Sequence, residues 1–123
     1  KLMIENTYNK LGSENLELLV DRFYALVLTN KVIAPLFKSD IEEVKRKQTM
    51  FLTQFLGGPM LYSEEFGHPR MRMRHMPHTI TTDAAHEWLK CMKAAIYSLN
   101  ISTELKEQTY LRFPKLAQHM INQ

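Results

Sequence analysis

An irregular stretch from Gly57 to Ile80 divides the chain, because no single helix or strand can run through it. It reads GGPMLYSEEFGHPRMRMRHMPHTI, and its glycines and prolines interrupt regular backbone hydrogen bonding. It also concentrates histidine and arginine, at His68, His75, His78, Arg70, Arg72 and Arg74. A long segment with such side chains inside one compact domain is typical of a functional site.

The segments around this stretch have helical spacing. Apolar residues recur every three or four positions in Leu16, Leu19, Val20, Phe23 and Val27, in Ile41, Val44, Phe51, Leu52 and Phe55, and in Ala85, Trp88, Leu89, Met92, Ile96 and Leu99. Ser13, Asp40 with Glu43, Thr81 to Asp83, and Ser102 or Thr103 are expected to cap helix starts. Helix ends are expected at Asn30, Gly57–Gly58 and Asn100, with a helical corner over 31–38 and a last helix kinked at Pro114. The sequence therefore predicts an all-α domain over residues 1–123, with about four main helices.

Composition narrows the class of protein. The 123 residues are 45% apolar and 24% charged, which suits one soluble domain with a single core. We find no apolar run long enough for a membrane span and no signal peptide. The single cysteine, Cys91, fits a reducing compartment, so we expect a cytoplasmic protein without disulfides or a multi-cysteine metal site. The net charge of +3 leaves nucleic acid, phosphate or a carboxylate ligand open as partners.

Three kinds of site are weaker interpretations of these residues. His68, His75 and His78 could hold zinc, but Pro77 disturbs their spacing and no carboxylate nearby is an obvious ligand. Cys91 could act as a nucleophile with His86 or His75, although it falls just off the face that carries Trp88 and Met92, and a buried free cysteine is normally an inert packing residue. The arginines lack the aromatic interleaving and recognition helix that would favour nucleic acid.

A haem site uses more of the unusual residues together. One imidazole is the usual protein ligand of a gas-binding haem iron, and arginine or lysine can pair with the propionates. Phe37, Phe51, Leu52 and Met92 can wall an apolar pocket. Tyr24, Gln48 and Trp88 are hydrogen-bond donors on the inward faces of three helices, where a bound oxygen needs them. Gln48 is the anomaly, since a buried glutamine must pair with the protein or with a ligand.

The motifs DRFYALV, KRKQTMFLTQFLGGPMLYSEEFGHP, RMRHMP and EWLKCM resemble those of the truncated haemoglobins of the second group, especially proteins of Gram-positive bacilli. The resemblance runs from about Ser13 to Gln123. It implies a two-over-two helical globin fold around one haem b. By this resemblance His75 is the proximal iron ligand, Tyr24, Gln48 and Trp88 face the bound gas, and Phe37 lies above the haem. Val44, Lys47, Tyr62 and Arg74 match positions that contact the haem or its propionates.

Two residues depart from the family pattern. Val44 stands where bacillus-like relatives have threonine, which removes a hydroxyl from the distal wall. His78 stands where phenylalanine is usual, so it is a packing substitute, a rival ligand or a pH-sensitive group. Neither departure changes the proposed iron ligand, His75.

The resulting expectation is a five-coordinate haem protein that binds dioxygen reversibly and tightly. The resemblance implies oxygen or nitric oxide redox chemistry, or weak peroxidase-like activity with a reductase partner, rather than bulk oxygen transport. The alternatives are a gas sensor or scavenger without turnover, and a cofactor-free module that binds anions through Arg70, Arg72 and Arg74. Either a monomer or a homodimer is compatible with the sequence.

Overall fold

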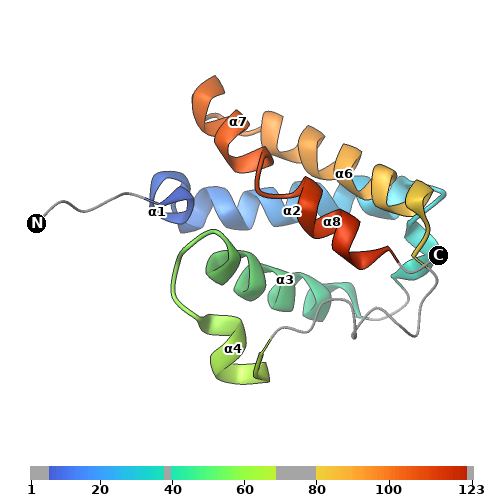
Figure 1. The fold of residues 1–123 in the computed structure, drawn as a ribbon, viewed down its shortest axis with the longest axis horizontal. Helices are drawn as coiled ribbons and strands as arrows, with labels where there is room; N and C mark the ends of the chain where they lie inside the picture. Colours follow the sequence, from blue (N-terminus) through green and yellow to red (C-terminus); the bar gives the residue numbers. More distant parts are fainter. Residues whose placement is uncertain (1–5, 38–39, 69–79, 122–123) are drawn as a thin grey trace, which may run out of the picture.

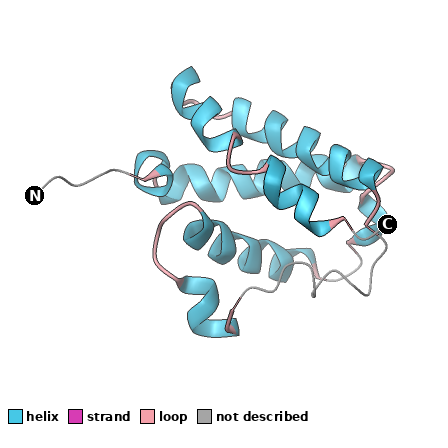
Figure 2. Ribbon diagram, in the orientation of Figure 1, coloured by secondary structure: helices cyan, strands magenta, loops and turns pink. Residues whose placement is uncertain are grey.

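The computed structural model describes residues 6–37, 40–68 and 80–121, and every regular element within them is a helix (Figure 2). The elements are α1 (Thr7–Leu11), α2 (Ser13–Thr29), the short 3₁₀ helix η1 (Ala34–Leu36), α3 (Ile41–Phe55), α4 (Leu61–Phe66), α6 (Thr82–Tyr97), α7 (Thr103–Tyr110) and α8 (Pro114–Met120). The all-α prediction is confirmed.

Two pairs of helices build the core. Helix α2 packs against both α3 and α6, and α6 packs against α8 (Figure 1). The pairs α2–α3 and α6–α8 make the two layers of the expected two-over-two arrangement. The layers meet through fully buried side chains that include Phe23 of α2, Leu52 of α3, Met92 and Ile96 of α6, and Phe113. No helix of the described residues is long and apolar enough to cross a membrane.

Most of the expected helix caps are present. The side chains of Asp40, Thr81 and Ser102 accept hydrogen bonds from backbone N–H groups in the first turns of α3, α6 and α7. The capping box with Glu43 is wrong, because Asp40 accepts from the N–H of Glu42 and Glu43 pairs with Arg46 instead. Ser13 is also not a cap. Gly12, with φ of 82°, precedes α2, since only glycine adopts this backbone conformation easily.

The N-terminal helix α1, which the sequence did not predict, explains the two glycines at the end of α3. The Asn6 side chain donates to the carbonyl of Gly57 at 2.8 Å, and the Tyr8 N–H donates to the carbonyl of Leu56 at 2.9 Å. A methyl group at Gly58 would lie only 2.7 Å from the Tyr8 ring. Gly57 and Gly58 therefore do more than end a helix, because they let α1 approach the backbone there.

The last helix is broken rather than kinked. Helix α7 ends at Tyr110, and α8 begins at Pro114 in its first turn, where the missing N–H needs no partner. Phe113 lies between them with its side chain fully buried. The break therefore places α8 over α6, in position to cover one side of the cavity described next (Figure 1).

Candidate functional site

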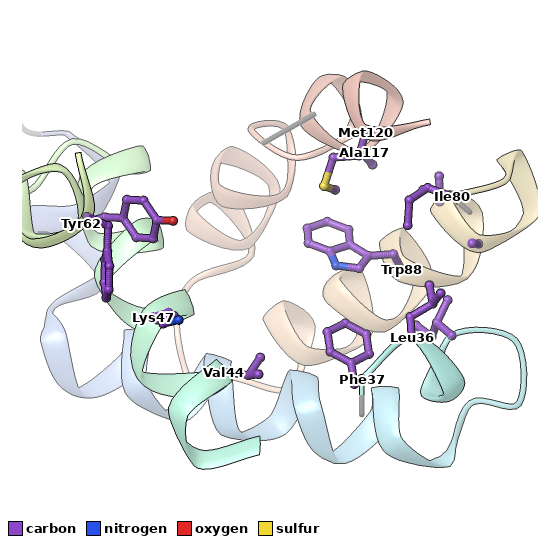
Figure 3. Close-up of a pocket in the computed structure, with 13 residues that line it drawn as sticks. Leu36, Phe37, Val44, Lys47, Tyr62, Ile80, Trp88, Ala117 and Met120 are labelled. Carbon is purple, nitrogen blue, oxygen red and sulfur yellow. The ribbon is translucent and has the colours of Figure 1, made fainter. Parts of the chain in front are cut away.

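A cavity of about 340 Å³ lies between the two helix pairs (Figure 3). Its walls come from η1, α3, α4, α6, α8 and the segments next to them. The lining residues are Ile33, Leu36, Phe37, Val44, Lys47, Tyr62, Phe66, Ile80, Ala84, Ala85, Trp88, Ala117 and Met120. Most of these side chains are apolar, so the cavity suits a large apolar ligand with few polar groups.

Apart from the Trp88 indole N–H, the labelled polar groups of the lining lie toward one side (Figure 3). Figure 3 shows the Tyr62 hydroxyl and the Lys47 ammonium group at the α3–α4 side, opposite Trp88, Ile80 and Met120. The Lys47 ammonium also lies 5.3 Å from the centre of the Phe66 ring, a cation–π distance. This side of the cavity therefore offers a positive charge and a hydroxyl to an anionic group.

Trp88 of α6 and Phe37 form the opposite aromatic wall (Figure 3). The Trp88 ring lies edge-on to Phe23 at 5.2 Å between centroids and is tilted against Phe113 at 5.9 Å. These contacts fix the indole plane from two sides. Phe37 in turn lies edge-on to Tyr24 at 5.5 Å.

Tyr24 of α2 lies behind this wall, with only 3% of its surface exposed. Its ring also contacts Phe23 edge-on at 4.9 Å. Burial raises the pKa of the Tyr24 phenol well above its ordinary value, because the charged phenolate would lose its hydration. The hydroxyl therefore stays protonated and remains a hydrogen-bond donor at every physiological pH.

Gln48 of α3 is half-buried and follows Val44 by one helical turn. Residues four apart lie on the same face of a helix, so Gln48 shares the face that Val44 presents to the cavity. Within the described parts of the chain, no hydrogen bond to a protein partner is seen for the Gln48 amide, the Tyr24 hydroxyl or the Trp88 indole N–H, and no buried side-chain nitrogen or oxygen is left without a partner. Three helices thus carry three donors that the rest of the described protein leaves available.

Several expected wall residues lie elsewhere. Phe51, Leu52 and Met92 are buried in the core and are not among the residues that line the cavity. His68 is exposed after Gly67. His75, His78, Arg70, Arg72 and Arg74 belong to residues 69–79 and lie outside the described part of the chain.

Other wall residues were not predicted as such from the sequence. Ala117 and Met120 of α8, Ala84 of α6 and Phe66 of α4 line the cavity but were not singled out as wall residues. Small residues such as Ala84, Ala85 and Ala117 leave space between closely packed helices. Ala84 and Ala85 stand close to Trp88 in the sequence, which could have indicated a cavity wall there. Ala117 reaches the same cavity only because the fold packs α8 against α6.

Cys91 does not form an activated thiol site. It is buried near α2, where the Asn30 side-chain nitrogen approaches its sulfur at 3.9 Å. Burial, reinforced by the charge of Glu87, raises the pKa of the Cys91 thiol. A raised pKa lowers the fraction of reactive thiolate, so the cysteine behaves as packing.

An all-helical two-layer fold around one apolar cavity, with hydrogen-bond donors beside it, is the structure of a globin-type binding protein. The chain belongs to the bacterial-like globin family, whose model matches residues 6–122. Membership of this family implies haem binding and is consistent with haem-based oxygen binding. It therefore opposes the alternative of a cofactor-free basic module.

The relatives are truncated haemoglobins. The chain is 47% identical over 116 residues to group 2 truncated hemoglobin YjbI of Bacillus subtilis, covering 94% of this chain and 88% of the relative. The structure of the group II truncated haemoglobin of Bacillus anthracis superposes with a TM-score of 0.92 at 40% identity, covering 98% of this chain and 94% of that one. A truncated oxygen-avid haemoglobin from Bacillus subtilis gives 0.90 at 45% identity, covering 96% and 100%.

Proposed function

We propose that this protein holds one haem b in the cavity and binds dioxygen reversibly and tightly at a five-coordinate iron. The observation that carries the proposal is a set of three donors on three helices beside the cavity. Trp88 lines it, Gln48 follows the lining residue Val44 by one helical turn, and the Tyr24 ring contacts the lining residue Phe37. Each of these side chains can donate a hydrogen bond to a ligand that accepts one. Their presence together favours a ligand that develops partial negative charge when it binds.

The residues of the cavity fit a haem. Apolar side chains such as Val44, Phe37 and Met120 provide flat, dry walls for a macrocycle. The Lys47 ammonium and the Tyr62 hydroxyl at the polar side suit the two carboxylates of haem. The chain has one cysteine, so the C-x-x-C-H attachment of c-type haem is absent, which supports haem b.

We assign the iron ligand to His75, following the match of RMRHMP to the family's proximal histidine. His75 precedes the cavity-lining Ile80 by five residues, a separation that an extended chain spans with at most about 18 Å. The proposed propionate partner Arg74 is its neighbour in sequence. A haem iron held by one histidine supplies an open position for a diatomic gas.

The protein's own part is to hold that gas. The Tyr24 hydroxyl and the Gln48 and Trp88 N–H groups can each donate a hydrogen bond to it. Several donors on one acceptor slow its departure. Slow release suits oxygen or nitric oxide redox chemistry, or weak peroxidase-like activity supported by a reductase, better than bulk transport.

Titration of the purified protein with haemin, followed by visible spectroscopy, tests this proposal. We expect one equivalent to bind with a Soret band and, after reduction, a reversible spectral change under oxygen. His75→Ala should lose histidine ligation, whereas His78→Ala should keep it. The iron-ligand assignment is wrong if the His75 variant retains the wild-type spectrum. Haem binding itself is wrong if the Soret band in the presence of wild type stays that of free haemin, with no shift that saturates at one equivalent.

A further inference from the structure

Helix α4 supplies two wall residues of the cavity, Tyr62 and Phe66, although it has only six residues. A helix this short is not stable on its own and depends on contacts with the rest of the fold. The connection before it is fixed by backbone hydrogen bonds, since the Gly58 N–H donates to the carbonyl of Thr53 on α3 at 2.8 Å. Side-chain contacts with α3 add to these bonds and reach further along α4.

Arg46 of α3 connects the C-terminal end of α4 to α3. Its guanidinium group donates to both carboxylate oxygens of Glu65 on α4, at 2.8 and 3.3 Å. The same group donates to both oxygens of Glu43 on α3, at 2.9 and 3.0 Å. It also lies over the Phe66 ring at 5.8 Å. The hydrogen bonds from Arg46 lower the pKa values of the Glu43 and Glu65 carboxyls, which keeps both charged near neutral pH.

Gln54 of α3 holds the other end of α4. Its side-chain nitrogen donates to the Ser63 hydroxyl at 2.8 Å, and its side-chain oxygen accepts from the Ser63 N–H at 3.0 Å. This paired contact is uncharged and half-buried. Tyr62 lies directly before Ser63, and its hydroxyl points into the cavity (Figure 3).

We infer that Arg46 and Gln54 are positioning residues that hold α4 against α3, so that Tyr62 and Phe66 close the cavity and slow the loss of bound haem. We call these contacts, made by Arg46, Glu43, Glu65, Gln54 and Ser63, the α4 clamp. The inference rests on the proposed function, since it concerns how long the proposed haem stays bound. It assigns a role to side chains that are not themselves part of the cavity lining.

The two ends of the clamp differ in their response to salt. The Arg46–Glu65 pair is solvent-exposed on both sides, so dissolved ions weaken it. The Gln54–Ser63 contact carries no net charge and has no such dependence. Added salt should therefore weaken the contribution of Arg46 to haem retention and leave the contribution of Gln54 unchanged.

The test measures the rate of haem transfer from the reconstituted protein to an excess of a second apoglobin with a distinct spectrum. We expect Arg46→Gln to lose haem roughly two- to fivefold faster than wild type at low salt. The ratio of the two rates should fall toward one at about 1 M NaCl, where the Debye length is about 3 Å.

Gln54→Ala should accelerate haem loss by a factor that salt does not change. In the double variant Arg46→Gln/Glu65→Gln, the rate should match that of Arg46→Gln.

Lys45→Gln is the matched control. Lys45 directly precedes Arg46 on α3 and forms ion pairs with Asp21 and Glu42, but neither partner lies on α4. The control removes the same charge from the same helix and should leave the rate of haem loss at the wild-type value. If Arg46→Gln and Lys45→Gln behave alike, the clamp has no role in retaining haem.

Hydrogen exchange provides a readout that does not require haem. The Glu64 and Gly67 amides donate to carbonyls of Met60 and Ser63. Arg46→Gln should speed their exchange in both the apoprotein and the haem-loaded protein, while the core amides of α2 and α6 keep theirs. Unchanged exchange at α4 would overturn the clamp even if haem binds normally. Faster exchange in a protein that fails to bind haem would instead overturn the proposed function alone.

Discussion

Gly58→Ala is expected to destabilise the protein through a clash that can be located to two atoms. The new Cβ would lie 2.7 Å from Cδ2 of Tyr8 and 2.9 Å from the carbonyl oxygen of Thr53. The Tyr8 ring could move, but the Thr53 carbonyl accepts the Gly58 N–H at 2.8 Å and is part of the backbone. Overpacking of this kind typically lowers the free energy of unfolding by about 1–3 kcal/mol. Gly58 is not among the glycines with positive φ, so backbone strain does not add to this value.

Urea unfolding of the apoprotein, followed by circular dichroism, measures this change without the contribution of bound haem. The same substitution should be measured in a Tyr8→Ala background, where the ring is gone and only the Thr53 contact remains. We expect a smaller loss there than in wild type, because the two residues are coupled. A change below about 0.5 kcal/mol in wild type, within the range of ordinary surface substitutions, would refute the argument that α1 packs on this glycine.

Three further predictions concern single side chains. Because burial raises the pKa of Tyr24, only the unfolded chain ionises this phenol as the pH rises past its ordinary value of 10.0. The free energy of unfolding should therefore fall above that pH. Tyr24→Phe should remove part of this fall, as measured by unfolding experiments at a series of pH values. Cys91, buried and with a raised pKa, should react with an aromatic disulfide reagent slowly in the native protein and fast in urea; rapid native reaction would contradict its burial. Val44→Thr adds a hydroxyl to the cavity wall and should slow oxygen dissociation by a few fold, as measured by stopped-flow spectroscopy; an unchanged or faster rate would mean that this position does not reach the bound gas.

The long helices could be predicted from the sequence because local signals agree there. Periodic apolar residues and capping side chains such as Asp40, Thr81 and Ser102 each act within one or two turns. The short helices α1 and α4 could not be predicted, since contacts distant in sequence hold them. Asn6 reaches Gly57, and Arg46 reaches Glu65. Pro114 was predicted to kink the last helix, and the structure instead breaks that helix beside the buried Phe113.

The candidate site was also predictable only in part, because contacts between residues distant in sequence decide which side chains line the cavity. Trp88, Phe37, Val44, Lys47 and Tyr62 were named from the sequence and line the cavity. Family motifs carried most of that prediction, since spacing alone does not separate a cavity wall from a core. Phe51, Leu52 and Met92 have the same apolar character, yet they pack in the core. Ala117 and Met120 reach the cavity only because the chain turns back at Pro114.

The rate of oxygen dissociation from the reconstituted ferrous protein tests the central claim most directly. The claim is that the donors on α2, α3 and α6 hold the bound gas. We expect Tyr24→Phe, Gln48→Leu and Trp88→Phe each to release oxygen faster, with roughly tenfold for the loss of the Tyr24 hydroxyl. Tyr97→Phe, at an exposed tyrosine on α6, should match wild type. Wild-type rates in all three donor variants, with haem still bound, would contradict the account.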